Sequence, residues 1–114
     1  MNLIDMHCDT LWKLMDLGGK GDFVNNNCDI CLSKLRKADS MAEFFACYIG
    51  MTQMPGNNTE EKYEAGYEHA LKMIDVFHQQ MENNRNEIAQ ARNYDEILEL
   101  NSQNKLAAVL TIEE

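Results

Sequence analysis

Residues 3–11, LIDMHCDTL, place a short apolar stretch directly before a histidine, one spacer residue and a carboxylate. This pattern predicts a strand that ends near His7 and Asp9, because helical spacing of apolar residues begins immediately afterwards. In an extended strand, side chains two residues apart point to the same side. His7 and Asp9 can therefore converge above the strand end. An imidazole and a carboxylate together suit a divalent ion such as zinc.

The same segment also allows an interpretation without a metal. Aspartate is a favourable N-cap residue, so Asp9 can begin the helix that follows, while His7 is a buried and hydrogen-bonded histidine. The pattern of one histidine, one spacer and one aspartate is too short to separate these two interpretations.

The composition is that of an ordinary globular domain, and it narrows the choice of partners. The 114 residues are 45% hydrophobic and 25% charged, with a formal net charge of -9. Such an acidic chain offers no basic surface to a nucleic-acid backbone. No apolar stretch approaches the roughly 18 residues of a membrane span, and the N-terminus lacks a signal-peptide pattern. We therefore expect no nucleic-acid partner, no membrane span and a cytoplasmic location.

The four cysteines, Cys8, Cys28, Cys31 and Cys47, are expected to be reduced thiols because no secretion signal precedes them. Cys28 and Cys31 form a C-x-x-C pair, which can be redox-active or half of a zinc site. A zinc ribbon needs a second pair at similar spacing, and a redox motif should follow a strand. Residues 25–27 before the pair are asparagines that predict a turn. A thiol-redox module is therefore kept only as a third functional hypothesis.

Strand and helix patterns alternate along the rest of the chain. Apolar runs predict strands at residues 41–51 and 105–112, with a weaker candidate at 88–91. Helical spacing predicts helices at residues 10–17, 30–38, 59–82 and 94–100, closed by Gly18-Gly19 after the first and separated by polar loops at 20–27 and 101–104. This alternation is typical of parallel β/α units.

The long helix predicted at residues 59–82 has an N-cap at Thr59 and an apolar face. Asn93 is a similar N-cap for the last helix. The apolar face comprises Tyr63, Tyr67, Ala70, Leu71, Ile74, Phe77, His78 and Met81. We expect this face to pack on the sheet.

The last predicted strand runs directly into two carboxylates, Glu113 and Glu114. In β/α proteins, functional groups gather at the carboxyl ends of parallel strands. One of these glutamates is therefore expected to meet His7 and Asp9. Because an α/β barrel needs about 250 residues, residues 1–114 are expected to be the front part of a single barrel domain, incomplete as it stands.

Three blocks of the sequence, residues 4–12, 29–48 and 107–114, resemble the membrane dipeptidase (renal dipeptidase) family of zinc peptidases. The order and spacing of the blocks match, and the resemblance covers essentially the whole chain. It implies an α/β fold that provides the N-terminal β/α units of a (β/α)8 TIM barrel of the metal-dependent hydrolase type. It also implies an enzyme, a metallo-dipeptidase, with two zinc ions per complete site and dipeptides as substrates.

The resemblance assigns roles to four residues. It implies that His7 and Asp9 bind the first zinc, that Glu113 bridges both ions, and that Trp12 forms a wall of the substrate pocket. The family has a glycine where this chain has Glu114, so the choice of Glu113 over Glu114 depends on the preceding residue. The second-zinc histidines and the substrate-binding groups come from strands later than any in this chain, so the remaining catalytic groups are not assigned.

The implied reaction is hydrolysis of a peptide bond by a metal-bridging hydroxide, since two cations lower the pKa of a shared water. The alternative function is a catalytically incomplete or non-enzymatic barrel fragment that acts in packing or assembly. Such a fragment would expose strand edges and an apolar helix face. It would then associate with the missing half or with a second copy as a homo-oligomer.

Overall fold

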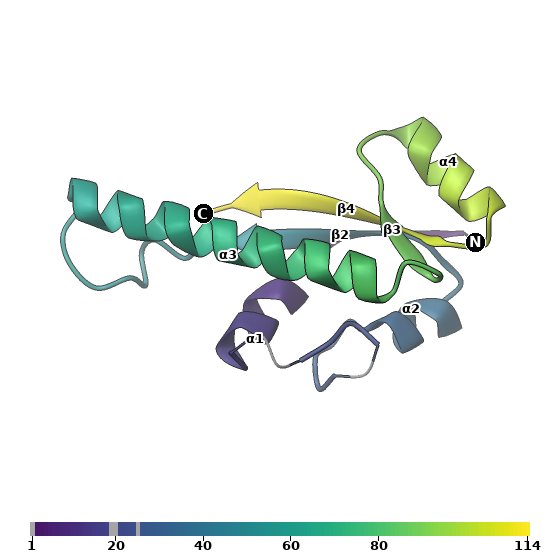
Figure 1. The fold of residues 1–114 in the computed structure, drawn as a ribbon, viewed down its shortest axis with the longest axis horizontal. Coiled ribbons are helices and arrows are strands. Elements are labelled where there is room, and N and C mark those ends of the chain that lie inside the picture. Colours follow the sequence, from purple (N-terminus) through teal and green to yellow (C-terminus); the bar gives the residue numbers. More distant parts are fainter. Residues whose placement is uncertain (1, 19–20, 25) are drawn as a thin grey trace.

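The computed structural model describes residues 2–18, 21–24 and 26–114, and within them four strands form one parallel sheet (Figure 1). The strands are β1 (Leu3–Cys8), β2 (Ser40–Tyr48), β3 (Ile88–Gln90) and β4 (Leu106–Glu113), in the order β1-β2-β4-β3. The helices are α1 (Thr10–Asp16), α2 (Leu32–Lys37), α3 (Glu60–Asn83) and α4 (Tyr94–Ser102). The predicted parallel β/α arrangement is confirmed. No helix among these residues is long and apolar enough to cross a membrane.

The ends of the elements follow the predicted capping signals. The side chains of Thr59 and Asn93 accept hydrogen bonds from the backbone N–H groups three residues later, as N-caps do. After α1, Gly18 adopts a φ of 65° and donates its N–H to the Met15 carbonyl. Gly19 of the predicted stop, Lys20 of the predicted loop and Asn25 of the predicted turn lie outside the described residues.

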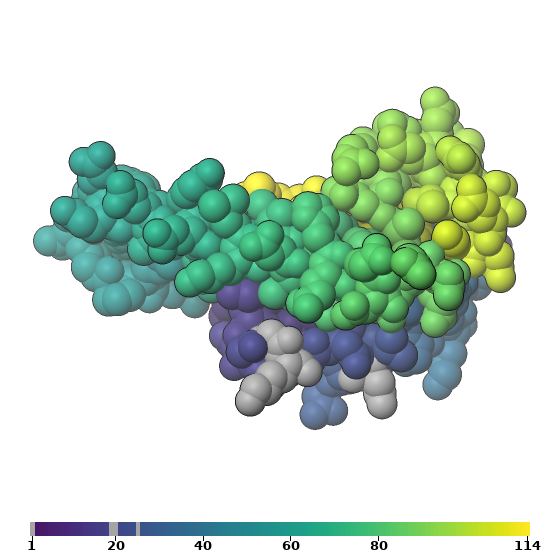
Figure 2. Space-filling model, viewed as in Figure 1, coloured from purple at the N-terminus to yellow at the C-terminus, as the bar shows by residue number. Residues whose placement is uncertain are grey.

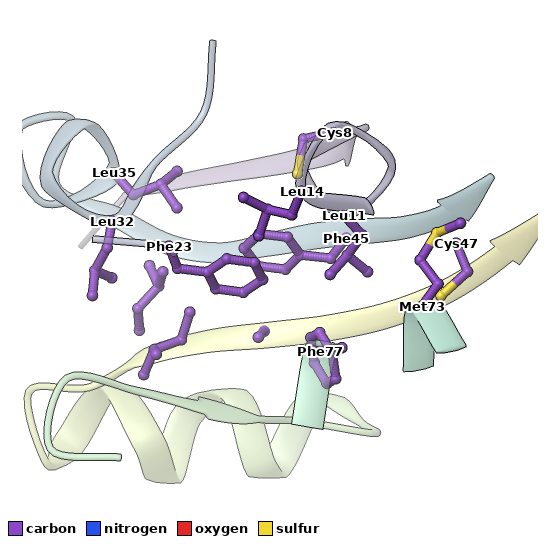
Figure 3. Close-up of a cluster of buried hydrophobic side chains, with 13 residues drawn as sticks. Cys8, Leu11, Leu14, Phe23, Leu32, Leu35, Phe45, Cys47, Met73 and Phe77 are labelled. Carbon is purple, nitrogen blue, oxygen red and sulfur yellow. The ribbon is translucent and has the colours of Figure 1, made fainter. Parts of the chain in front are cut away.

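The main core lies on one face of the sheet, beneath α1, α2 and α3 (Figure 3). Phe45 of β2 is its centre, with Phe23 stacked on it at a ring separation of 4.6 Å and Phe77 of α3 6.0 Å away. Phe23 belongs to the segment at residues 20–27, which the sequence predicted to be a polar loop. The loop therefore contributes a fully buried ring that was not predicted.

The opposite face of the sheet is covered by α4, at one end only (Figure 1). There Ala42 of β2 and Ala107 of β4 contact Ile97, and the absence of larger side chains lets the helix approach the strands closely. Both alanines lie near the beginnings of their strands. The carboxyl-terminal halves of β2 and β4 on this face carry no helix in the part of the chain described.

The buried face of α3 agrees in part with the predicted one, because Ala70 and Phe77 are buried and Ile74 and Met81 pack against the main core. Its buried residues are Gly66, Ala70, Met73, Phe77 and Gln80, whereas the predicted Tyr63, Tyr67, Leu71 and His78 are exposed. Hydrophobic periodicity does not predict the burial of a glycine and a glutamine. Gly66 is covered by Met51, which lies so close that a side chain at residue 66 would collide with it. Gln80 is buried because its amide hydrogen-bonds with the backbone of the loop at Gly21 and Phe23.

The exposed side of α3 forms one wall of an apolar groove with a volume of about 350 Å³. Tyr63, Tyr67 and Leu71 contribute from the helix, and Ile112 contributes from the end of β4. Figure 2 shows the amino-terminal half of α3 and the loop before it extending beyond the rest of the molecule. The groove therefore lies beside the carboxyl ends of the strands.

Glu43 is a fully buried carboxylate on β2, beside Asp5 of β1. Neither of its oxygens has a full hydrogen-bond partner among the described residues, and the Cys8 thiol, a weak donor, is the polar group that approaches it. Burial raises the pKa of Glu43 from 4.5 to about 7. The Asp5 carboxylate adds to this increase, while Cys8 and His7 partly oppose it.

Replacing Glu43 by glutamine should remove a pH dependence of the folding stability. Because the pKa of Glu43 is raised in the folded state, its contribution is fully present below about pH 4.5 and is lost as the pH rises through about 7. The difference in pKa corresponds to about 3 kcal/mol. Urea unfolding from pH 5 to 8.5 should show this loss in the native chain but not in Glu43→Gln. Glu64→Gln, at an exposed position on α3, is the matched control and should keep the native dependence.

Candidate metal centre

The end of β1 is irregular at the residues that precede the candidate site. Between Asp5 and Cys8, β1 advances three residues while its partner β2 advances two, from Glu43 to Phe45. Such a bulge changes the direction of the side chains within it. The Asp5 carboxylate accepts a hydrogen bond from the His7 N–H at 3.3 Å, which stabilises the irregular backbone. Cys8 then points into the main core, and His7 lies outside it.

Asp9 occupies the N-cap position of α1, as one of the two interpretations predicted, but its side chain makes no capping hydrogen bond. Its carboxylate instead lies 3.3 Å from His7 Nε2. Its Oδ1 atom is buried and has no hydrogen-bond partner among the described residues. Asp9 therefore directs a polar atom towards His7 rather than towards the helix that it begins.

Glu113, at the end of β4, completes a group of three possible ligands. Its carboxylate lies 3.5 Å from His7 Nε2, and one donor atom from each of His7, Asp9 and Glu113 lies within 4.8 Å of the others. Glu114 lines the apolar groove instead. The parallel register places Glu113 beside Tyr48 of β2, so residues more than a hundred positions apart meet at one edge of the sheet.

The geometry of these three side chains fits a divalent metal ion. Ligands about 2.0–2.1 Å from a tetrahedral ion lie about 3.3 Å from one another, and the two distances from His7 Nε2 are 3.3 and 3.5 Å. The unpartnered Oδ1 of Asp9 is explained if it binds a cation. All three side chains are between two-fifths and one-half exposed, so a plain ion pair here would contribute little stability.

A cavity of about 370 Å³ opens beside two of the three side chains, and His7, Asp9 and Trp12 line it. Its volume lies within the range of about 300–1,000 Å³ that small-molecule sites occupy. Trp12, predicted as a pocket wall, packs its ring edge-on against Tyr48 with the centroids 5.8 Å apart. The structure thus places Trp12 beside the candidate ligands.

Two residues near the site were not predicted from the sequence, Ala46 and Tyr48. Strand alternation puts both on the face of β2 opposite to the buried Phe45 and Cys47. Since β2 lies between β1 and β4, a small residue at Ala46 leaves room on this face for side chains from the two neighbouring strands. A small residue within an otherwise large apolar run is the signal that could have indicated this.

The remaining cysteines and histidines do not join the cluster. Cys28 and Cys31 are free and buried, and Cys28 lines the cavity. Burial raises the pKa of the Cys31 thiol, but its hydrogen bond with Ser33 and the neighbouring Lys34 outweigh burial and leave it below its ordinary value. His69 and His78 lie on α3, and neither belongs to the group of possible metal ligands found among the described residues.

A parallel β/α sheet with possible metal ligands at the ends of its strands defines an enzyme-like α/β domain. Residues 1–114 match the membrane dipeptidase family, peptidase family M19, and the chain belongs to that family. No curated protein matches it. The crystal structure of a dipeptidase AC, a metallopeptidase of family M19, is similar with a TM-score of 0.74 at 16% sequence identity.

The similarity to the dipeptidase AC structure confirms the fold and shows how much of that relative the present chain spans. It covers 97% of this chain and 34% of that chain, so the present chain spans about one third of its solved relative. The predicted α/β fold, with the amino-terminal β/α units of a metal-dependent hydrolase barrel, is therefore confirmed.

Replacing Ala46 by leucine should prevent His7 and Glu113 from meeting. The longer side chain would occupy the space over β2 between β1 and β4, so we expect metal affinity to fall by at least about 10-fold, comparable to the loss of an outer-shell contact. Ala46→Ser, which adds a single oxygen atom, is the matched control and should bind metal normally. Equilibrium dialysis of both variants checks this, with circular dichroism to verify folding. Normal metal affinity in the leucine variant would show that a small side chain at Ala46 is not needed for metal binding.

Proposed function

We propose that the chain provides the first part of the active site of a zinc-dependent dipeptidase, which hydrolyses the peptide bond of dipeptides. The single observation that carries this proposal is the convergence of His7, Asp9 and Glu113 at the carboxyl ends of β1 and β4, in a chain of the membrane dipeptidase family. One imidazole and two carboxylates match the ligand types of catalytic zinc.

The three side chains have distinct roles in this proposal. His7 and Asp9 hold one zinc ion, and Glu113 is shared with a second ion, as a carboxylate between two cations reduces their mutual repulsion. When bound, zinc lowers the pKa of water and polarises a carbonyl group. Trp12 forms a wall beside this centre and excludes water from one side of the bound dipeptide.

We also propose that residues 1–114 form the front part of a single barrel domain. β3 pairs with β4 only as far as Ala108, so the outer edge of β4 is unpaired from there to Glu113 among the described residues. The apolar groove lies beside this free edge, where Tyr67 is 66% and Ile112 is 60% exposed. A further strand beside β4 and a helix on α3 would bury both features, as in a closed barrel.

A second candidate function is an incomplete barrel fragment that acts in packing or assembly. The exposed groove and the free strand edge favour it, because both invite association with another chain. Dipeptide hydrolysis by the protein produced from its complete coding sequence separates the two candidates. The dipeptidase should release free amino acids only when zinc is present.

Replacing Asp9 by asparagine tests the ligand role directly. The amide keeps the size of the side chain but loses its negative charge, so zinc affinity should fall by more than about 100-fold, and dipeptide hydrolysis should fall with it. Asp16→Asn makes the same chemical change at an exposed position on α1 and should leave both properties unchanged. Zinc content and ninhydrin-detected amino acid release provide the readouts. Native zinc content and hydrolysis in Asp9→Asn would refute the assignment.

A further inference from the structure

Cys28 and Cys31 lie in the segment that connects α1 with α2, and both are buried and free. Cys28 lines the cavity that His7 and Asp9 also line, and Cys31 is the N-cap residue of α2. The residues directly before the pair, 26 and 27, form no strand, unlike those before a typical redox motif. The contacts of the two thiols therefore determine what chemistry they can do.

The backbone between the two cysteines is bent, and Lys34 of α2 binds it on both sides of the bend. The bend covers residues 27–29. The Lys34 ammonium group donates hydrogen bonds to the carbonyls of Cys28 at 2.7 Å and of Asp29 at 3.1 Å. The Lys34 backbone N–H donates to the Cys31 carbonyl at 3.0 Å. A disulfide needs Cα atoms about 4.4–6.8 Å apart, and residues three positions apart reach this separation when the chain between them bends.

Cys31 is the thiol that reacts first with an oxidant. Burial raises its pKa, but its hydrogen bond with Ser33 Oγ at 3.1 Å and the nearby Lys34 outweigh burial and leave the pKa below its ordinary value. By contrast, burial raises the pKa of Cys47 to about 11, and it raises the pKa of Cys8 as well. Because the thiolate is the reactive form, Cys31 is more reactive than either of these core thiols.

A small oxidant can reach both sulfur atoms although the two side chains are buried. Ser33, the hydrogen-bond partner of the Cys31 thiol, is exposed, so this thiol lies just beneath the surface. Cys28 is reached through the cavity of about 370 Å³ that it lines. Hydrogen peroxide is small enough to use both routes.

We propose that Cys28 and Cys31 form a reversible disulfide when the protein meets hydrogen peroxide. The Cys31 thiolate attacks one peroxide oxygen, so that an S–O bond forms, the O–O bond breaks and hydroxide leaves. The Cys28 sulfur then attacks the Cys31 sulfur, so that the S–S bond forms, the S–O bond breaks and a second hydroxide leaves. Each hydroxide takes up the proton of one thiol. The two thiols are oxidised, and the peroxide is reduced to two water molecules.

The new bond would restrain one wall of the cavity. Thr10 Oγ1 donates a hydrogen bond to the Ile30 carbonyl at 3.1 Å. Lys13 Nζ lies 3.5 Å from Asp29 Oδ2. Both contacts tie the segment between the cysteines to α1, the helix beside the cavity. The thiol chemistry itself does not depend on the proposed dipeptidase activity.

The test treats the native protein, produced from its complete coding sequence, with hydrogen peroxide, alkylates the remaining thiols and digests it with trypsin. Cys28 and Cys31 share the tryptic peptide 21–34, whereas Cys8 and Cys47 fall in two other peptides. Mass spectrometry should show that peptide 21–34 has lost two hydrogen atoms and takes up no alkylating agent. Dithiothreitol should restore both thiols. Before oxidation, at neutral pH, Cys31 should be alkylated at least about 10-fold faster than Cys47.

Two variants separate the roles of the thiols. Cys28→Ala removes the second sulfur, so oxidation of Cys31 should stop at the sulfenic acid, which dimedone traps. Cys47→Ala makes the same chemical change in the main core and is the matched control. It should form the disulfide as the native protein does.

Two free thiols in peptide 21–34 after peroxide treatment would overturn the inference. A disulfide that joins this peptide to the peptide of Cys8, or irreversible oxidation of Cys31 beside a free Cys28, would also overturn it. All three outcomes are measured on the native protein, so the test does not depend on the folding of a variant.

Discussion

The parallel pairing of β2 with β1 and with β4 is the constraint on which the candidate site depends. It brings the carboxyl ends of three strands to one edge, so that His7, at the start of the chain, lies 3.5 Å from Glu113 near its end. The bulge between Asp5 and Cys8 lets the side chain of Cys8 enter the core while the side chain of His7 stays outside it. On the intervening strand β2, the small side chain of Ala46 takes up little room on the face that Tyr48 shares.

The charges of the site explain why the arrangement suits a metal ion better than an ion pair. Asp9 and Glu113 are both half exposed, and only His7 stands between them. Half-exposed pairs of this kind contribute at most about 1 kcal/mol, whereas a divalent cation compensates both carboxylates at once. Glu43 on the neighbouring strand β2 differs from these two carboxylates. It is fully buried, and the resulting increase in its pKa favours the neutral form of its side chain.

Much of this structure was predictable because it depends on local patterns. The strand before His7, the caps at Thr59 and Asn93 and the carboxylate at the end of β4 all follow from residues close together in sequence. The buried face of α3 was predicted only in part, because Gly66 and Gln80 are buried through contacts with distant parts of the chain. Tyr48 and Ala46 were missed for a similar reason, since their importance comes from the position of β2 between two other strands.

The most direct test of the metal centre is a crystal structure of the zinc-loaded protein with anomalous diffraction recorded at the zinc edge. A zinc peak should lie about 2.0–2.2 Å from His7 Nε2 and from one carboxylate oxygen of Asp9, with Glu113 in contact with the same ion. Zinc bound elsewhere, for example at Cys28 and Cys31, with no peak between His7 and Asp9 would contradict this account.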